Sequence, residues 1–296
     1  MITDNGMTLP EDGTRYFWTD PAGTGDTGGR NWFALWGLVD VWNRLWIYRE
    51  WPCEHIPVAG VGLPGPWATP GQDKKSHKYG GIPGPGCMSF GFGLKDYKAE
   101  FARLEGWDDA RADIPVEDWS ADNGCRERIY LRYMDRRFGN TPHQQKEGNT
   151  TLQDNMADLG MHFELITGHA SQDGRGAIDH GIDLINDALA YTPEWLEQME
   201  GKRSDLDTLQ MIQQGPSLFI CADCTNLWFA LSAYTSMGGH KEATKDPIDT
   251  LRYALHSNPI YIEDFRSGST TRGGYGRRIS GQGEANVGRK ERRFGG

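Results

Sequence analysis

The sequence predicts an α/β protein in which a mixed β-sheet is flanked by helices. Three apolar and aromatic segments follow one another near the start of the chain, as in an antiparallel three-strand meander. Farther along, segments with helical periodicity alternate with short apolar runs, which adds parallel strands to the meander. The order of elements therefore indicates one mixed sheet with helices packed on it.

The three strands of the meander are predicted at residues 15–20, 31–39 and 44–50. Aromatic and β-branched residues are frequent in all three, and a short turn at residues 40–43 joins the last two. The segment that follows, residues 52–93, is rich in proline and glycine and reads as irregular. It is too long for a simple connection, so we expect it to serve a function.

The glycines between the first two predicted strands have the spacing of a nucleotide-binding loop. Gly23, Gly25 and Gly28 have the spacing G-x-G-x-x-G, but a dinucleotide site requires a helix directly afterwards, and residues 31–39 read as a strand. A P-loop would require Lys and then Ser or Thr, where the chain has Gly29 and Arg30. We therefore predict that these glycines connect two antiparallel strands.

The second part of the chain contributes the remaining predicted elements. Helical spacing of apolar residues predicts helices, and short apolar runs predict strands. The predicted helices are 94–105, 150–159, 178–190, 224–234 and 245–256, and the predicted strands are 127–134, 161–166 and 217–221. No internal repeat is visible.

Charge is distributed unevenly over the 296 residues, whose formal net charge is −10. Residues 265–296 carry eight Lys/Arg and two Glu, a net charge of +6, which leaves −16 on the rest. Such an asymmetry indicates either contact between the basic, Gly/Ser-rich tail and a polyanion or a flexible, solvated terminus. We accordingly divide the chain into a folded domain, residues 1–264, and a flexible tail, residues 265–296.

Cysteines and apolar runs restrict the class of protein further. The five cysteines are irregularly spaced, which argues against a disulfide framework; only Cys221 and Cys224 form a C-x-x-C, and we expect buried thiols rather than a zinc or redox site. No run of eighteen apolar residues and no signal region is present, so a soluble, intracellular protein without a membrane partner is predicted.

Four aspartates occupy positions at which acids can converge. Asp20 ends the first predicted strand, Asp135 ends the fourth, and Asp246 and Asp249 lie on the first turn of the last predicted helix. Acids at strand ends meet at one edge of an α/β sheet, and Mg²⁺ or Mn²⁺ prefers oxygen ligands. The pattern favours metal-assisted cleavage of a phosphodiester.

Each of these aspartates also has a structural interpretation. Asp20 precedes Pro21 and can begin a turn, and Asp135 is flanked by arginines with which it can form surface ion pairs. Asp246 can be the N-cap of a helix that has Pro247 at its first position. Asp249 can interact with the helix dipole or pair with Arg252, three residues farther on.

Several motifs resemble the C-terminal nuclease domain of bacteriophage large terminase subunits. They are "YFWTDPAG", "LWIYREWP", "YMDRR", "TTLQDNM" and especially "KDPIDTLRYAL", and the likeness runs from about Arg15 to His256. The resemblance implies an RNase H-like fold and two Mg²⁺ or Mn²⁺ ions held by the four aspartates, with Asp20 bridging them. Glu50, which ends the third strand, is by the same resemblance either a supporting ligand or a structural residue.

The resemblance implies an endonuclease that cuts concatemeric viral DNA in the host cytoplasm during genome packaging. No Walker A motif is present, so the packaging ATPase is expected on a separate polypeptide or a missing part, with the portal as another partner. The 52–93 segment would be a lid or a guide for DNA. We expect double-stranded DNA to contact five basic residues: Arg136, Arg137, Lys146, Arg277 and Arg278.

Two other functions remain open at this point. The first is a non-catalytic RNase H-like packaging module that docks the motor to the portal; retention of all four aspartates favours the enzyme, whereas the acidic body is unfavourable for tight DNA binding. The second is a nuclease similar to Holliday-junction resolvases, which differs in its substrate.

Overall fold

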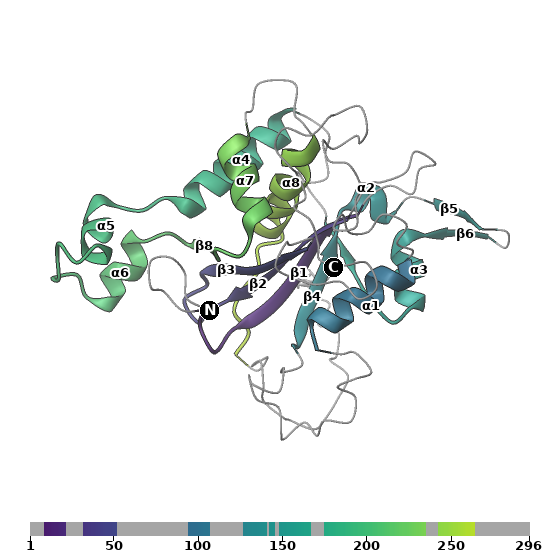
Figure 1. The fold of residues 1–296 in the computed structure, drawn as a ribbon, viewed down its shortest axis with the longest axis horizontal. Coiled ribbons are helices and arrows are strands. Elements are labelled where there is room, and N and C mark those ends of the chain that lie inside the picture. Colours follow the sequence, from purple (N-terminus) through teal and green to yellow (C-terminus); the bar gives the residue numbers. More distant parts are fainter. Residues whose placement is uncertain are drawn as a thin grey trace, which may run out of the picture.

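A six-stranded mixed sheet forms the centre of the fold (Figure 1). The computed structural model describes residues 9–21, 32–51, 94–106, 127–140, 142–145, 148–166, 175–234 and 242–263. The sheet has the strand order β7-β4-β1-β2-β3-β8. Its strands are β1 (Thr14–Asp20), β2 (Phe33–Val39), β3 (Leu45–Trp51), β4 (Ile129–Met134), β7 (Glu164–Leu165) and β8 (Leu218–Ile220). The predicted α/β class with a mixed sheet is confirmed.

The first three strands form the predicted antiparallel meander. β4 pairs in parallel with the free side of β1, β7 pairs in parallel with β4, and β8 pairs in parallel with β3. All seven residues of β2 are buried, because this central strand is covered on both faces. The glycine-containing connection predicted between β1 and β2 lies outside the described residues, but the antiparallel pairing it was expected to join is present.

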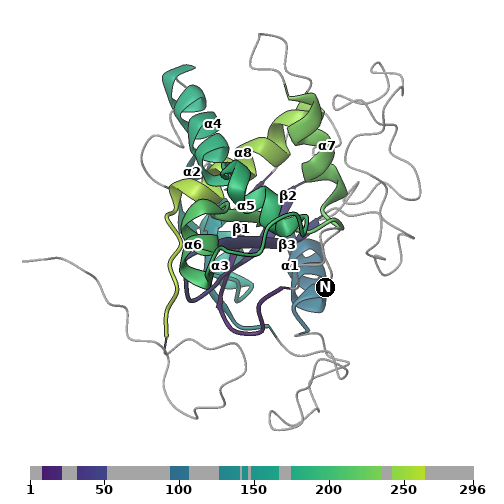
Figure 2. The same ribbon diagram turned by 90° about the vertical axis from the view of Figure 1, so that its left-hand side faces the viewer.

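Helices cover both faces of the sheet. α1 and α3 lie on one face, and α4, α7 and α8 lie on the other (Figure 1). Figure 2 shows the same layers from the side. The helices are α1 (Leu94–Leu104), α2 (Arg136–Gly139), α3 (Leu152–Asp158), α4 (Arg175–Leu189), α5 (Pro193–Met199), α6 (Thr208–Gln214), α7 (Thr225–Ala233) and α8 (Glu242–His256).

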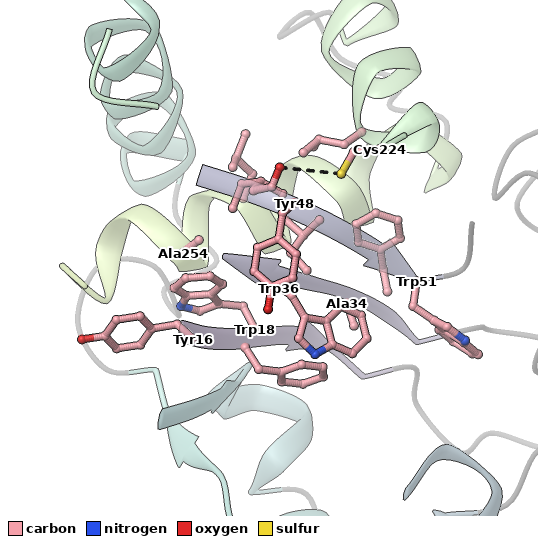
Figure 3. Close-up of a cluster of buried hydrophobic side chains, with 14 of the residues drawn as sticks. Tyr16, Trp18, Ala34, Trp36, Tyr48, Trp51, Cys224 and Ala254 are labelled. Atoms are coloured by element: carbon pink, nitrogen blue, oxygen red, sulfur yellow. Dashed lines mark hydrogen bonds between the residues drawn. The ribbon is translucent and has the colours of Figure 1, made fainter. Parts of the chain in front are cut away.

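Aromatic side chains fill the core on both faces. Towards α1, the Phe17 ring lies 4.8 Å from that of Trp36 and 5.1 Å from that of Phe101, between ring centroids. Trp18 points to the opposite face, where it lies beside Ala254 of α8 (Figure 3). Because large rings bury much apolar area per residue, a chain rich in tryptophan can stabilise this sheet with short strands.

A buried ion pair joins α1 to the sheet. Arg132 of β4 pairs with Glu105, which follows α1, and the Trp36 indole donates to the same carboxylate at 3.0 Å. Burial raises the pKa of Glu105, whereas the positive charge of Arg132 opposes that change. Removing one partner of such a pair leaves the other charge without compensation. The contact therefore helps to fix the position of α1 against the sheet.

The last helix begins earlier than the sequence predicted. α8 starts at Glu242, so Pro247 lies inside the helix and Asp246 and Asp249 lie in its second turn. The interpretation of Asp246 as N-cap and of Pro247 as the first helical residue is therefore wrong. Proline in the second turn removes the bond to the carbonyl of the fourth residue before it, and the helix continues beyond that single loss.

Several short elements were not predicted. They are α2, α5, α6 and a small hairpin of β5 (Pro142–Gln145) and β6 (Gly148–Thr151). The strand expected at 161–166 is only the two-residue β7. Reciprocal capping at the start of α6, between Asp207 and Gln210, is a local signal that could have revealed that helix.

Other predictions fall on segments that the structure does not describe, namely residues 52–93, residues 265–296, and Cys53, Cys87 and Cys125. Cys221 and Cys224 are buried thiols, as predicted, and neither is in a disulfide. Among the described helices, none is both long and apolar enough to cross a membrane.

Candidate functional site

The ends of β1 and β4 place two aspartates side by side. Thr19 and Met134 are the last paired residues of these parallel strands, and the Asp135 backbone N–H donates to the Thr19 carbonyl at 3.2 Å. Asp20 and Asp135 are each the next residue along, and neighbouring strands are about 4.8 Å apart. Both side chains are buried, with 9% of Asp20 and 3% of Asp135 exposed. Asp135 therefore lies below the surface, although arginines flank it in the sequence.

α8 and the segment after it run antiparallel to β1. The Tyr16 hydroxyl donates to the Ile260 carbonyl at 2.8 Å, and the Trp18 indole donates to the Ser257 hydroxyl at 2.8 Å. Side chains alternate along a strand, so Asp20 faces α8 as Tyr16 and Trp18 do. Residues later in β1 therefore lie next to residues earlier in α8. The second and third turns of α8 consequently lie near the end of β1.

Tyr253 of α8 lies among the carboxylates. Its side chain packs with Ile166 and Tyr133 beside β4. Burial raises the pKa of the Tyr253 phenol well above its ordinary value. Three negative charges raise it further: those of Asp20, Asp249 and Asp135. Three acids separated by more than 100 residues in the sequence thus act on one buried phenol, and we call Asp20, Asp135 and Asp249 the acid cluster.

Asp249 is held by an arginine on its own helix. The guanidinium of Arg252 forms an ion pair with the Asp249 carboxylate, and only 4% of the Arg252 side chain and 10% of the Asp249 side chain are exposed. The i,i+3 spacing places both on the same face of α8. The pairing of Asp249 with Arg252, one of the interpretations made from the sequence, is present.

Asp246 lies one turn before the acid cluster and is half-buried. The Thr250 hydroxyl donates to its backbone carbonyl at 2.8 Å, a bond that involves no carboxylate. Since Asp246 and Asp249 are three residues apart, they lie on neighbouring positions of the same helix face. Asp249 lies one turn of α8 before Tyr253 and Asp246 lies two turns before it, so Asp249 is the member of the pair nearer to Tyr253.

Glu50 has a different setting. Its two carboxylate oxygens accept the backbone N–H groups of Asn226 at 2.7 Å and Leu227 at 2.9 Å. Cys224, the N-cap residue of α7, makes no side-chain capping bond, so Glu50 takes that function from a neighbouring strand. Burial raises the pKa of Glu50 to about 8, although the amide groups stabilise its charged form. The structure thus shows a helix cap at Glu50.

Basic side chains border the acid cluster on one side. Arg136 and Arg137 begin α2 directly after Asp135 and are exposed. These two predicted DNA contacts are therefore near the acids and accessible to a phosphate. The other predicted contacts, Lys146, Arg277 and Arg278, lie outside the described residues.

The donor atoms of the acid cluster suit a hard divalent cation, but they do not form a complete cage. In the part of the chain that the structure describes, no group of three or more His, Cys, Asp or Glu side chains is arranged to hold a metal ion. Asp249 pairs with Arg252, and Asp20 and Asp135 are the two carboxylates that adjacent strand ends bring together. Mg²⁺ is often bound by one or two carboxylates together with water and substrate phosphates. Asp20 and Asp135 offer that number of carboxylates.

Two residues of the site were not predicted from the sequence. Tyr253 follows Asp249 by four positions, a spacing that places it on the same helix face, and this was the available signal. Gly181 of α4 lies against Arg252: a Cβ there would meet the Arg252 Nε, and would lie 2.9 Å from its Cδ. No pattern in the sequence links Gly181 to α8, because only the packing of two distant helices creates that contact.

Comparison with known proteins identifies no relative. No protein-family model matches the chain, and neither a curated protein nor a solved structure matches it. The resemblance to terminase nuclease domains therefore stays a prediction from the sequence.

Proposed function

We propose that the chain is a metal-dependent endonuclease that cleaves concatemeric viral DNA during genome packaging, working beside a packaging ATPase on a separate polypeptide. The observation that carries the nuclease proposal is the side-by-side placement of Asp20 and Asp135 at the ends of β1 and β4, next to which α8 carries Asp249. The acids come from two adjacent strand ends and a helix that crosses them. The packaging role and the RNase H-like family come from the sequence resemblance alone.

We assign each residue of the site a separate role in phosphodiester cleavage. Asp20 and Asp135 would hold Mg²⁺ or Mn²⁺, and Asp249 would complete the ligand set for a second ion. When bound, such ions supply an activated water and stabilise the leaving oxygen. The phenol of Tyr253 stays protonated at neutral pH, because its pKa is raised, so it adds no negative charge beside these acids. Arg136 and Arg137 can bind the phosphates on either side of the scissile bond.

A plasmid-nicking assay with a series of divalent cations tests the proposal. We expect the full chain to nick supercoiled DNA in Mg²⁺ or Mn²⁺ and to stop when a chelator is added. Asp20→Asn and Asp135→Asn should each reduce the rate by at least about 10³-fold, because neutral amides bind a dication poorly. Asp205→Asn, which removes an exposed acid paired with Arg203, is the matched control and should cut at the wild-type rate.

A non-catalytic packaging module is the second candidate. It is favoured by the absence, among the described residues, of a ready metal cage. If wild-type protein leaves DNA intact in every metal while it still binds the packaging ATPase or the portal, this candidate replaces the nuclease. A dimer that cuts four-way junctions in preference to linear duplex would instead favour the resolvase-like alternative.

A further inference from the structure

A polar network lies on the α1 face of the sheet, the face opposite α8. Phe17 of β1 points towards α1, and its partners in the register are Arg132 of β4 and Trp36 of β2. Arg49 of β3 pairs in turn with Trp36. Arg15 lies two residues before Phe17 on β1 and therefore points to the same face. Three arginine side chains thus come from three different strands onto one face.

Two of these arginines have a carboxylate partner. Arg132 forms an ion pair with Glu105. Both terminal nitrogens of Arg49 donate to the Glu127 carboxylate, at 2.6 and 3.0 Å, and the Tyr48 hydroxyl donates to it at 2.7 Å. Burial raises the pKa of the Tyr48 phenol well above its ordinary value, so the phenol stays neutral. The negative charge that the described residues contribute to this network therefore comes from two glutamates.

Arg15 is the third arginine of the network, and its charge has no such partner. Its Cζ lies 5.9 Å from the centroid of the Tyr48 ring, and the Arg49 Cζ lies 5.3 Å from the same centroid. In the part of the chain that the structure describes, Arg15 forms no ion pair, and its buried Nε makes no hydrogen bond. The buried Nε of Arg132 makes none either. Three positive and two negative charges leave the network with a net charge of +1.

The position of Arg15 favours the binding of an anion. The residue is half-buried and shares the Tyr48 ring with the Arg49 guanidinium, so two positive charges lie where water is partly excluded. Like charges placed in this way repel each other, and a buried N–H group without an acceptor adds a further cost. An oxyanion offsets both costs, because it supplies negative charge and several acceptor oxygens. The planar guanidinium group also matches the geometry of a phosphate and binds two of its oxygens at once.

We propose that Arg15 is the principal contact of an oxyanion-binding site on the α1 face of the sheet, and that the ligand is a phosphate group, either inorganic phosphate or part of a larger molecule. Arg49 and Arg132 keep their glutamate partners and add positive charge around the site. No residue of the acid cluster takes part, so this inference is independent of the proposed nuclease activity.

Thermal unfolding of the full chain during a titration with inorganic phosphate tests the proposal, with chloride at matched ionic strength as the reference. We expect phosphate to raise the melting temperature of wild type above its value in chloride, because a ligand that binds the folded state stabilises it. Broadening of the phosphorus NMR resonance of the added phosphate reports binding directly. Both measurements are made with a chelator present, so that divalent cations play no part.

Arg15→Gln removes the excess charge and the proposed contact. The phosphate concentration that gives half of the shift should rise by at least about tenfold, since a hydrogen bond between two charged groups is lost. Arg203→Gln is the matched control: it changes the net charge of the protein by the same amount, at an exposed arginine that pairs with Asp205. This variant should keep the wild-type midpoint.

Glu127→Gln changes the network in the opposite direction. It raises the net charge of the network from +1 to +2, so the phosphate concentration at half-shift should fall by about tenfold. Asp205→Asn, which removes one exposed acid, is its control and should leave the midpoint unchanged. If Arg15→Gln does not fold, Glu127→Gln decides, and an unchanged midpoint in that variant contradicts the proposal.

Two further results would overturn the inference: equal melting temperatures of wild type in phosphate and chloride, or an Arg15→Gln variant that keeps the wild-type midpoint. A short DNA duplex, added to wild type during the phosphorus NMR titration, identifies the source of the phosphate group. Displacement of inorganic phosphate by the duplex, lost in Arg15→Gln, assigns the site to a nucleic-acid backbone. Retention of the broadened resonance assigns it to small phosphates. Neither result depends on whether the protein cleaves DNA.

Discussion

Buried carboxylates at the same end of the sheet are held in two different ways. Glu50, on β3, accepts two backbone amides at the start of α7. Asp20, on β1, lies instead beside Asp135 at the end of β4, and both charges act on the Tyr253 phenol. In the register of the sheet the two regions are close, since Asp20 pairs with Phe33 and Glu50 with Leu35 on β2.

The difference distinguishes Glu50, which stabilises the fold, from the aspartates of the acid cluster, which lie close to other negative charges. Amide groups at a helix N-terminus need an acceptor, and a buried one without it costs about 1–3 kcal/mol, so Glu50 stabilises the protein. Like charges gathered at a point raise the free energy of the folded state. The nuclease proposal rests on the aspartates and not on Glu50, because Glu50 already serves as the cap of α7.

The largest expected effect tests directly whether Glu50 and Asp20 differ in their contribution to stability. Glu50→Ala should lower the free energy of unfolding by about 2 to 4 kcal/mol, because two buried amides lose their acceptor. Asp20→Asn should change it by less than about 1 kcal/mol, since it relieves repulsion at constant size. Urea denaturation in the presence of a chelator measures both. A large loss for Asp20→Asn together with a small one for Glu50→Ala would reverse our assignment of the two regions.

The pH dependence of stability gives the next largest effect. The pKa of Glu50 rises from 4.5 to about 8 on folding, so between these values the folded state binds more protons than the unfolded state. Stability is therefore highest at the acid end of this window and should fall, by up to about 1.4 kcal/mol per pH unit, as the pH rises towards 8. Unfolding free energies measured at intervals from about pH 5 to pH 8 test this slope.

Glu50→Gln is the control for that measurement, because an amide does not titrate. The difference between wild type and this variant should shrink or reverse as the pH rises through the window. Parallel curves for the two proteins would show that Glu50 is ionised throughout and that burial does not govern its pKa.

The smallest expected effect tests the contact between Gly181 of α4 and Arg252, the arginine that pairs with Asp249. Gly181→Ala should lower the unfolding free energy by about 1 kcal/mol, because the new Cβ displaces Arg252, although alanine in a helix ordinarily gains about that much. In an Arg252→Ala background the space is free and the same substitution should be stabilising. A double-mutant cycle by urea denaturation measures this coupling. Equal effects in both backgrounds would show that Gly181 does not serve Arg252.

The sequence predicted much of the sheet and little of the site's detail. β1, β2 and β3 were predictable because strands covered on both faces are apolar throughout and separated by turn residues. Asp20 and Asp135 were predictable because strand ends are visible in the sequence. The start of α8 was misplaced because Asp246 and Pro247 imitate a helix start inside a longer helix.

The features of the site that the sequence did not predict depend on contacts between segments far apart in the chain. Glu50 was left open between a supporting ligand and a structural residue, since the amides it caps belong to a helix about 176 positions away. The same holds for Gly181 and Arg252, whose contact depends on how α4 packs against α8. Local patterns identify which residues are able to act, whereas only the tertiary structure shows which of them meet.

The antiparallel course of α8 along β1 has a consequence for biosynthesis. The bond from Tyr16 to Ile260 spans 244 positions, so the first strand leaves the ribosome long before its partner exists. Asp20 and Asp135 can come together on the nascent chain, but Asp249 is made 114 residues after Asp135. The three aspartates therefore share one folded structure only after α8 has been synthesised and has packed along β1.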